Sequence, residues 1–311
     1  MQLIGKTTNI DFMGHRRLAV TVSIVLAIAS IAALIVKGLA FGIDFTGGVL
    51  VEVGYPEDSD LVVVRSQLAD GGFDTAIVQH FGTSRDVLIR LMPIEGMDGN
   101  DVREQILQSL RSDGSDIDLR RVEFVGPQVG QELTETGALA MLVAIIMILI
   151  YVALRFQWKF AVGAVAALVH DVVITLGFFA MLQFDFDLSV LAAILAVIGY
   201  SLNDTIVVFD RIRENMLKVR KGEPVDIMNL SINQMLARTL ITGLTTLLVL
   251  LALFLLGGEV IRPFSIALIV GVIVGTYSSI YVASATALAL KITVQDLLPP
   301  EKGEHEIDDL P

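Results

Sequence analysis

The chain has 311 residues, of which 54% are hydrophobic, and its mean hydropathy is +0.72. Soluble domains of this length are less apolar, so the composition predicts an integral membrane protein. The sequence contains no cysteine, which excludes disulfides, thiolate metal sites and a cysteine nucleophile. Its four histidines show no metal-ligand spacing, and a net charge of −12 disfavours nucleic acid as a partner.

Six apolar runs are each long enough to cross a bilayer, and lipid leaves a backbone no alternative to the helix. They cover residues 18–36, 136–154, 160–182, 188–209, 236–256 and 264–290. No small-residue cleavage site follows the first run, so we expect a retained membrane helix there and not a signal peptide. The last run is longer than required, which predicts that it tilts or ends early.

The distribution of Lys and Arg around these runs predicts the orientation of the chain. Positive side chains precede the first run and lie between the second and third and between the fourth and fifth, whereas the opposite hairpins are mainly acidic. This bias places residues 1–17, the loop 210–235 and the tail 291–311 in the cytoplasm. The insertion 43–135 is then an outer domain.

The outer domain alternates strand-like and helix-like patterns. The predicted elements are a strand at 48–53, a helix at 58–69, strands at 75–81 and 86–91, a helix at 100–111 and a strand at 117–125. This βαββαβ order predicts a small α+β sandwich of the ferredoxin-like type. The domain carries no catalytic constellation, and a spacer or docking module is the alternative to an active role.

A carboxylate inside the fourth run has the strongest functional signal. Asp204 has apolar sequence on both sides, and a charge near the centre of a membrane helix costs about 2.5–3.5 kcal/mol on insertion scales. Arg238 lies at a comparable depth in the fifth run, and a long arginine side chain can extend toward it. Protonation of such a carboxylate would release the cation and let helices rearrange. We therefore predict a proton relay that uses these two residues.

Other polar and small residues in the last four runs are expected to support this pair. The supporting polar candidates are Asp171, His170, Tyr200, Ser201, Asn203 and Thr242. In the sixth run, Gly271, Gly275 and Ser279 form a small-residue stripe that predicts close helix packing, expected against the fifth run. The first two runs have no such stripe, so we expect them at the periphery. No catalytic, cofactor-binding or metal-binding residues are expected.

Each of these residues also has a structural interpretation. Asp204 is alternatively a charge at a helix end that reaches the headgroups, and Arg238 an ordinary cytoplasmic anchor. His170 and Asp171 are alternatively a hydrogen-bonded pair with a structural role alone. The residues by themselves leave these alternatives open, and they do not decide between proton and sodium as the coupling ion.

Long motifs resemble the SecD/SecF family of protein-export membrane proteins, and in particular its smaller SecF members. Residues 197–215 (VIGYSLNDTIVVFDRIREN) are similar to the SecF signature, and residues 41–53 (FGIDFTGGVLVEV) to a motif that SecD and SecF share. Further similar stretches are 122–133, 168–179, 237–258 and 278–285. The resemblance covers nearly the whole chain.

The resemblance implies one six-helix half of a resistance-nodulation-division transporter, with SecD supplying the other half. It implies a place in the bacterial inner membrane, with residues 43–135 in the periplasm. The implied partners are SecD, the SecYEG channel, YajC, YidC, SecA indirectly, and translocating preproteins. The implied function is to couple the proton-motive force to late-stage translocation or release of preproteins, with proton passage at Asp204 and Arg238 and no cofactor.

Two other functions compete with this one. Small-molecule exporters of the same superfamily usually carry a second six-helix half and larger outer domains in one chain, and this chain has neither. A scaffold for the translocon would transport nothing and would not need the relay pair. An enzyme is disfavoured, because the outer domain shows no nucleophile–base group and no paired acid.

Overall fold

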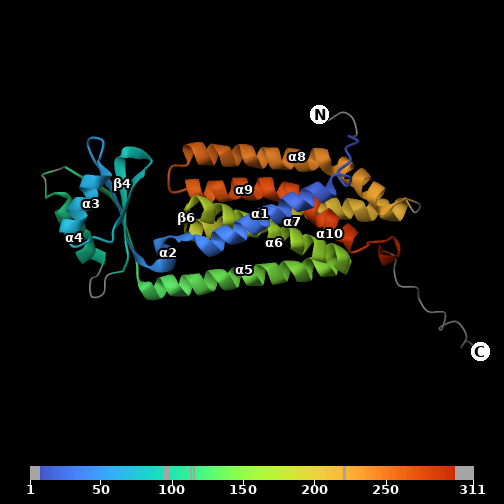
Figure 1. Ribbon diagram of the computed structural model, residues 1–311, viewed down its shortest axis with the longest axis horizontal. Coiled ribbons are helices and arrows are strands. Elements are labelled where there is room, and N and C mark those ends of the chain that lie inside the picture. The colour runs from blue at the N-terminus through green and yellow to red at the C-terminus, as the bar shows by residue number, and fades with distance from the viewer. Residues whose placement is uncertain (1–7, 94–98, 113, 115, 220–221, 298–311) are drawn as a thin grey trace, which may run out of the picture.

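The computed structural model describes residues 8–93, 99–112, 114, 116–219 and 222–297. Six helical spans among these residues are long and apolar enough to cross a membrane, which confirms the six predicted spans. They are α1 (Arg16–Val36), α5 (Pro127–Arg155), α6 (Trp158–Leu182), α7 (Leu188–Lys218), α8 (Pro224–Leu256) and a composite span from Arg262 to Ala289. Figure 1 shows a helical bundle with the outer domain at one end and the beginning of α1 at the other.

The loop predicted at residues 210–235 is mostly helical, because α7 and α8 together cover all of it except residues 219–223. The charged run after the fourth apolar stretch still buries Ile212 and Met216. An amphipathic pattern therefore extends the helix beyond its hydrophobic part. α5 also begins before its apolar run, with Pro127 in its first turn. Proline lacks a backbone N–H, and in the first turn that group would have no hydrogen-bond partner within the helix.

The sixth span does not end early. α9 (Arg262–Ser278) passes into a single π-helical turn, η1 (Ser279–Ala283), and continues as α10 (Ser284–Ala289). π-Helical turns of this kind occur frequently at functional sites. Here the turn begins immediately after Ser278, next to the most polar part of the bundle interior.

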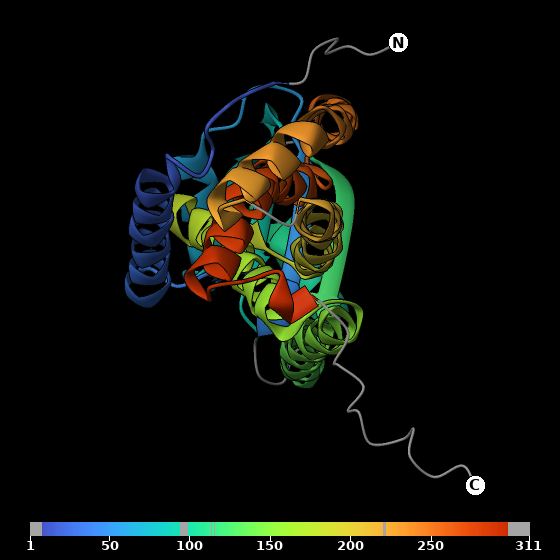
Figure 2. The ribbon, with the colours of Figure 1, turned by 90° about the vertical axis from the view of Figure 1, so that its right-hand side faces the viewer.

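Two helices form the centre of the bundle. In α6 and α7, 56% of the most apolar window is buried, against 17% in α1, 11% in α5 and 17% in α8. Figure 2 shows α1 and α5 at the rim of the bundle, as predicted for the first two spans. α8 is as exposed as α1, although only the first two spans were predicted at the periphery.

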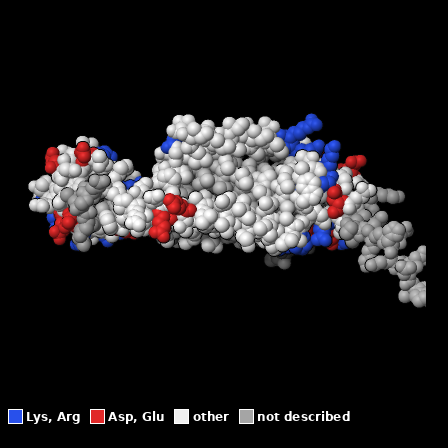
Figure 3. Space-filling view, turned by 90° about the horizontal axis from the view of Figure 1, so that it is seen from below, with Lys and Arg blue, Asp and Glu red and all other residues white. Residues whose placement is uncertain are grey.

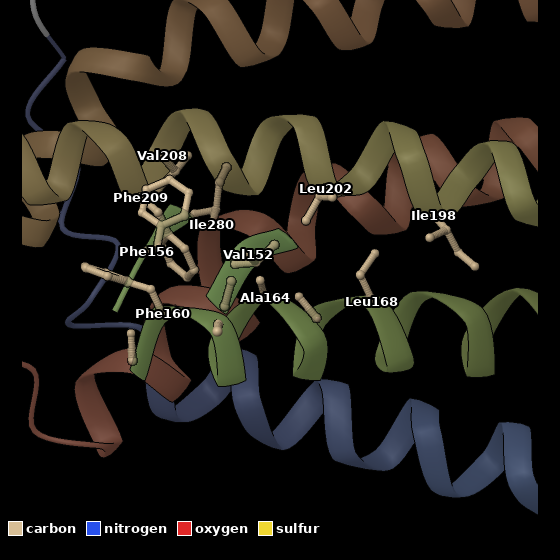
Figure 4. Packing of buried hydrophobic residues seen from close by; sticks show 14 of the residues in the cluster. Val152, Phe156, Phe160, Ala164, Leu168, Ile198, Leu202, Val208, Phe209 and Ile280 are labelled. Atoms are coloured by element: carbon tan, nitrogen blue, oxygen red, sulfur yellow. The ribbon is translucent and has the colours of Figure 1, made fainter. Parts of the chain in front are cut away.

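The apolar core between α6 and α7 begins with aromatic side chains. Phe160 and Phe209 are fully buried, with ring centroids 4.7 Å apart, and Phe156 packs beside both. Figure 4 shows this cluster continuing along the two helices through Leu168 and Ile198. This packing positions the polar residues that lie between the same helices.

Glycines in α9 allow it to approach α7 closely. A Cβ added to Gly271 would lie 2.1 Å from Cγ2 of Val197, and one added to Gly275 would lie 3.0 Å from Cβ of Ser201. The expected packing of this stripe against the fifth span is therefore wrong, because these glycines face the fourth. The fifth span approaches the sixth through its own Gly243, where an added Cβ would lie 3.5 Å from Oγ1 of Thr276.

The outer domain has the predicted βαββαβ order. Its elements are β2 (Gly48–Gly54), α3 (Leu61–Asp70), β3 (Ile77–Phe81), β4 (Thr83–Leu91), α4 (Gly99–Leu110) and β5 (Asp118–Val125). The strands are ordered β3-β4-β2-β5 and every neighbouring pair is antiparallel, which is consistent with a ferredoxin-like sandwich. α3 begins later than predicted, because Asp60 caps it by accepting a hydrogen bond from the Val62 N–H.

The backbone joins the outer domain to the bundle twice, at α2 (Ile43–Thr46) and where β5 runs through Gly126 into α5, and an ion pair adds a further attachment. At the first of these, after α2, Gly47 and Gly48 have φ of +70° and +128°. A Cβ on Gly48 would lie 2.2 Å from the carbonyl oxygen of Leu91, so only glycine fits there. The ion pair, of 2.7 Å, joins Arg90 of β4 to Asp185. Asp185 belongs to β6 (Asp185–Phe186), which joins α6 to α7 and pairs in parallel with β1 (Ala40–Phe41).

The end of the bundle opposite the outer domain is also tied together. The side chain of Asn233 in α8 exchanges two hydrogen bonds with the backbone of Ile10, of 2.9 and 2.8 Å. Lys159 pairs at 2.7 Å with Asp296 in a 3₁₀ turn, η2 (Gln295–Leu297). Lys and Arg gather at this end in Figure 3, while the bundle surface between the ends is largely uncharged. This is the end that the charge bias predicts to be cytoplasmic.

We predict that Gly271→Ala lowers the stability of the isolated chain by about 1–3 kcal/mol, because the added methyl overpacks the contact with Val197. Thermal unfolding in detergent measures this change. Gly199→Ala is the matched control, since no described atom lies within 4 Å of a Cβ at that position of α7. Equal shifts for the two variants would contradict the proposed contact.

Candidate functional site in the membrane bundle

A buried carboxylate joins three membrane spans at the centre of the bundle. Asp171 of α6 is only 1% exposed. One of its oxygens, Oδ2, accepts hydrogen bonds from Ser201 of α7 at 2.5 Å and from Ser278 of α9 at 2.7 Å. The other, Oδ1, lies 2.9 Å from Nδ1 of His170. Hydrogen bonds to charged groups contribute about 1.5–3 kcal/mol each, so this carboxylate ties α6, α7 and α9 together.

The polar network continues into the π-helical turn. The hydroxyl of Ser279 lies 2.8 Å from that of Thr205 in α7, and it also reaches the carbonyl oxygen of Gly275 at 2.8 Å. Thr175, one turn after Asp171 in α6, donates to the Asp171 carbonyl at 2.8 Å. All five hydroxyls of this network are thus hydrogen-bonded, as groups removed from water need to be: those of Thr175, Ser201, Thr205, Ser278 and Ser279.

Asp204 has a different environment from Asp171. It is 3% exposed, yet its Oδ2 has no hydrogen-bond partner among the described residues. α7 continues for fourteen residues beyond it and the side chain is buried, so Asp204 is not an exposed charge at the end of the helix. A buried carboxylate without hydrogen bonds is costly, and strained or unsatisfied groups of this kind are expected at functional positions.

Arg238 lies on the exposed surface of α8. It is near enough to act electrostatically on Asp204, but no ion pair within 4.0 Å joins the two described side chains. Thr239, the next residue, is 2% exposed, and its hydroxyl also lacks a hydrogen-bond partner among the described residues. Asp204 of α7 and Thr239 of α8 are thus both buried with a polar atom that no described residue bonds.

The other predicted residues lie around this region in different ways. Tyr200 is half-buried, with its hydroxyl 3.8 Å from the position of a Cβ on Gly243 of α8. Asn203 is exposed on the outer side of α7. Thr242 is half-buried, and its carbonyl oxygen accepts the Thr246 hydroxyl at 2.9 Å. The predicted set thus divides between an internal network around Asp171 and a surface where α7 meets α8.

Sequence reasoning missed several members of the internal network. Thr205 and Ser278 bond to the network, and Tyr277 lies against His170 with ring centroids 6.3 Å apart. Thr205 follows Ser201 by four residues, a spacing that puts both on one helix face. That spacing could have identified Thr205. Nothing in the sequence could show which helix Ser278 faces.

Comparison with known proteins identifies the family to which this chain belongs. A family model for the C-terminal part of the protein export membrane proteins SecD/SecF matches residues 105–293, and a SecD/SecF GG motif model matches residues 32–55. The chain is 52% identical over 313 residues to the protein translocase subunit SecF of Vibrio alginolyticus, covering 100% of this chain and 99% of that one. The chain belongs to the SecF family.

Other relatives agree with this assignment. The SecF subunit of Pseudomonas aeruginosa is 48% identical, over 98% of this chain and 99% of that one. The crystal structure of SecDF from Thermus thermophilus, a translocon-associated membrane protein, superimposes with a TM-score of 0.84 and 38% identity. The match covers 94% of this chain but only 40% of the SecDF chain. SecF-family membership, predicted from the motifs, is confirmed, and this is a membrane protein of the Sec translocase.

We predict that removing Asp171 destabilises the chain and that removing Asp204 does not. Asp171→Ala leaves His170, Ser201 and Ser278 without their acceptor and lowers the stability of the isolated chain by about 3–5 kcal/mol. Asp204→Ala removes an unsatisfied group and leaves stability unchanged or higher. Denaturation of both variants in detergent tests this contrast, which fails if Asp204→Ala is as damaging as Asp171→Ala.

Proposed function

We propose that this chain is the proton-coupling half of a protein-export unit. With a SecD-like chain, it would use the proton-motive force to draw preproteins out of the translocon at a late stage and release them on the outer side of the bacterial inner membrane. One observation carries this proposal: Asp204 is buried in the membrane bundle without a hydrogen-bond partner for its Oδ2 among the described residues. An intramembrane carboxylate of this kind is typical of proton relays.

The surface near Asp204 supports the presence of a second half. Asn203 of α7 and Arg238 of α8 are both exposed on helices that cross the membrane. Polar side chains inside a bilayer almost always face a protein interior or a water-filled cavity. A SecD-like chain packed over α7 and α8 would enclose both residues, and the solved SecDF chain is much longer than the part this chain matches.

The proposed switch acts through charge on Asp204. When Asp204 is ionised, it attracts the Arg238 guanidinium and favours helix positions that bring the two together. When it is protonated, that attraction ends and apolar packing determines the helix positions. A gradient that protonates Asp204 from one side and deprotonates it toward the other would drive the bundle through both arrangements.

The α6–α7 hairpin offers a route from this switch to the outer domain. Its outer tip carries Asp185, which pairs with Arg90 of the outer sheet, and its second helix carries Asp204. A shift of α7 would therefore move the point at which the outer domain is attached. Pulling or releasing a preprotein on the outer side would follow from this movement.

The remaining assignments belong to the same proposal. Residues 1–17 and 291–311 would lie in the cytoplasm and residues 43–135 in the periplasm, in keeping with the Lys and Arg at one end of the bundle. The SecYEG channel, YajC and YidC would be neighbours in the membrane. SecA would act earlier, from the cytoplasmic side.

We predict that Asp204→Asn abolishes the stimulation of preprotein translocation by a proton gradient, because the amide cannot exchange a proton. Translocation into inverted membrane vesicles, with and without an uncoupler, measures this effect. Asp210→Asn on the same helix is the control, because Asp210 is exposed and forms only a surface ion pair with Arg155. If Asp204→Asn assembles normally and keeps its response to the gradient, the chain is a scaffold and the relay is wrong.

We also predict that Gly199→Leu prevents association with the SecD-like chain without destabilising this chain alone. Gly199 is exposed on the outer face of α7, near Asn203, with no described atom close to its missing side chain. Ala32→Leu, on the exposed face of α1, adds bulk where only lipid is expected. Co-purification distinguishes the two variants, and loss of the partner with Ala32→Leu, or its retention with Gly199→Leu, would contradict the proposed interface.

A further inference from the structure

A lateral cavity opens between α1, α6 and α10, on the side of the bundle where α1 packs. It has a volume of about 320 Å³. Its lining is mainly apolar, but three polar side chains face it: Ser23 of α1, His170 of α6 and Thr286 of α10. Along α1 the cavity extends from Ala27 toward the beginning of the helix, and along α10 it reaches Ala289, the last residue. It therefore extends from the depth of His170 to Val20, one turn after the beginning of α1.

The histidine in this cavity has one nitrogen without a partner. His170 is more than nine-tenths buried, and its Nδ1 faces the Asp171 carboxylate. A neutral imidazole beside an ionised carboxylate carries its hydrogen on Nδ1, which leaves Nε2 as an acceptor. Nε2 is buried and has no hydrogen-bond partner among the described residues. An unpaired polar atom at such a position costs about 1–3 kcal/mol unless something bonds to it.

Water is the group that fits this nitrogen. His170 lies at the middle of α6, about 18 Å along the helix from either end, beyond the reach of lipid headgroups. Ser23 and Thr286 donate their hydroxyl hydrogens to Tyr277 and Val282, so both oxygens keep lone pairs free to accept. A water molecule needs two to four polar partners and about 10–15 Å³ of accessible volume, and this cavity offers three partners and room for many waters.

We propose that this cavity is a water-filled vestibule through which His170 exchanges protons with the aqueous phase at the end of the bundle where α1 begins. The titratable groups that face His170 are Asp171 on its own helix and Tyr277 of α9, against which Tyr281 of η1 stacks. The polar side chains that α1 and α10 place in the lining, Ser23 and Thr286, carry hydroxyls and no titratable group. Protons taken up at His170 reach the Asp171 carboxylate, which joins α6, α7 and α9. The use of this cavity in proton coupling rests on the proposed function, whereas the filling of the cavity with water does not.

Single cysteines test the water filling, because the chain contains none of its own. Ala27→Cys places a thiol in the cavity, and Ile28→Cys places one at nearly the same depth on the lipid side, where Ile28 is 62% exposed. Thiols react as thiolates, which form in water and not in hydrocarbon. In the complex in lipid nanodiscs, a charged methanethiosulfonate reagent should modify Ala27→Cys about tenfold faster than Ile28→Cys, or more. Equal, slow reaction would mean that lipid fills the cavity and would overturn the proposal.

A second measurement needs no substitution in the cavity. In deuterated water, the carbon-bound hydrogen between the two ring nitrogens of histidine exchanges only where water reaches the ring, and its rate follows the protonation of the ring. Mass spectrometry of the intact complex should show exchange at His170 with a rate that changes with pH, with exposed His80 as the reference. An absence of exchange at His170 would refute the vestibule even if the cysteine variants did not fold. Neither result depends on Asp204, so failure of the Asp204 relay would be distinguishable from failure of this inference.

Discussion

The Asp171 carboxylate is the interaction on which the arrangement of the bundle depends. It accepts hydrogen bonds from serines on two other spans, and all three side chains are buried in the bundle. Apolar side chains alone would not define how α6, α7 and α9 align, because lipid is as apolar as leucine and gives no hydrophobic drive between helices. The carboxylate therefore fixes the register of three spans, and the glycines of α9 bring the backbones close enough for the serines to reach it.

The two intramembrane carboxylates show how stability and function are divided. Asp171 has its acceptors filled inside this chain, whereas Asp204 is buried without a partner for Oδ2 among the described residues. A satisfied group holds helices in one arrangement, while an unsatisfied one makes a second arrangement accessible. Asn203 and Arg238, near Asp204, are exposed. Polar side chains on a membrane helix are stable where protein or a water-filled cavity covers them, so this surface is suited to a second arrangement with a partner.

The outer domain is attached where such a change would be transmitted. It follows the first span through two glycines in conformations that other residues rarely adopt, and it is bound to the tip of the α6–α7 hairpin through Arg90 and Asp185. The backbone connects the domain to the bundle at α2 and again at α5, whereas Arg90 and Asp185 are joined by an ion pair, so this contact can shift while the backbone connections hold. The central hairpin thus connects the intramembrane polar groups with the outer sheet.

Hydrophobic runs long enough to cross a bilayer determined the six spans, and alternating patterns determined the outer strands, because both signals are local in the sequence. The motifs around Asp204 determined the family for the same reason. Contacts between distant segments were decided only by the tertiary structure. Gly271 and Gly275 face the fourth span and not the fifth, and Ser278 reaches Asp171 from a different helix. A helix carries polar residues on a face that its sequence reveals, but which neighbour meets that face depends on the packing of the whole bundle.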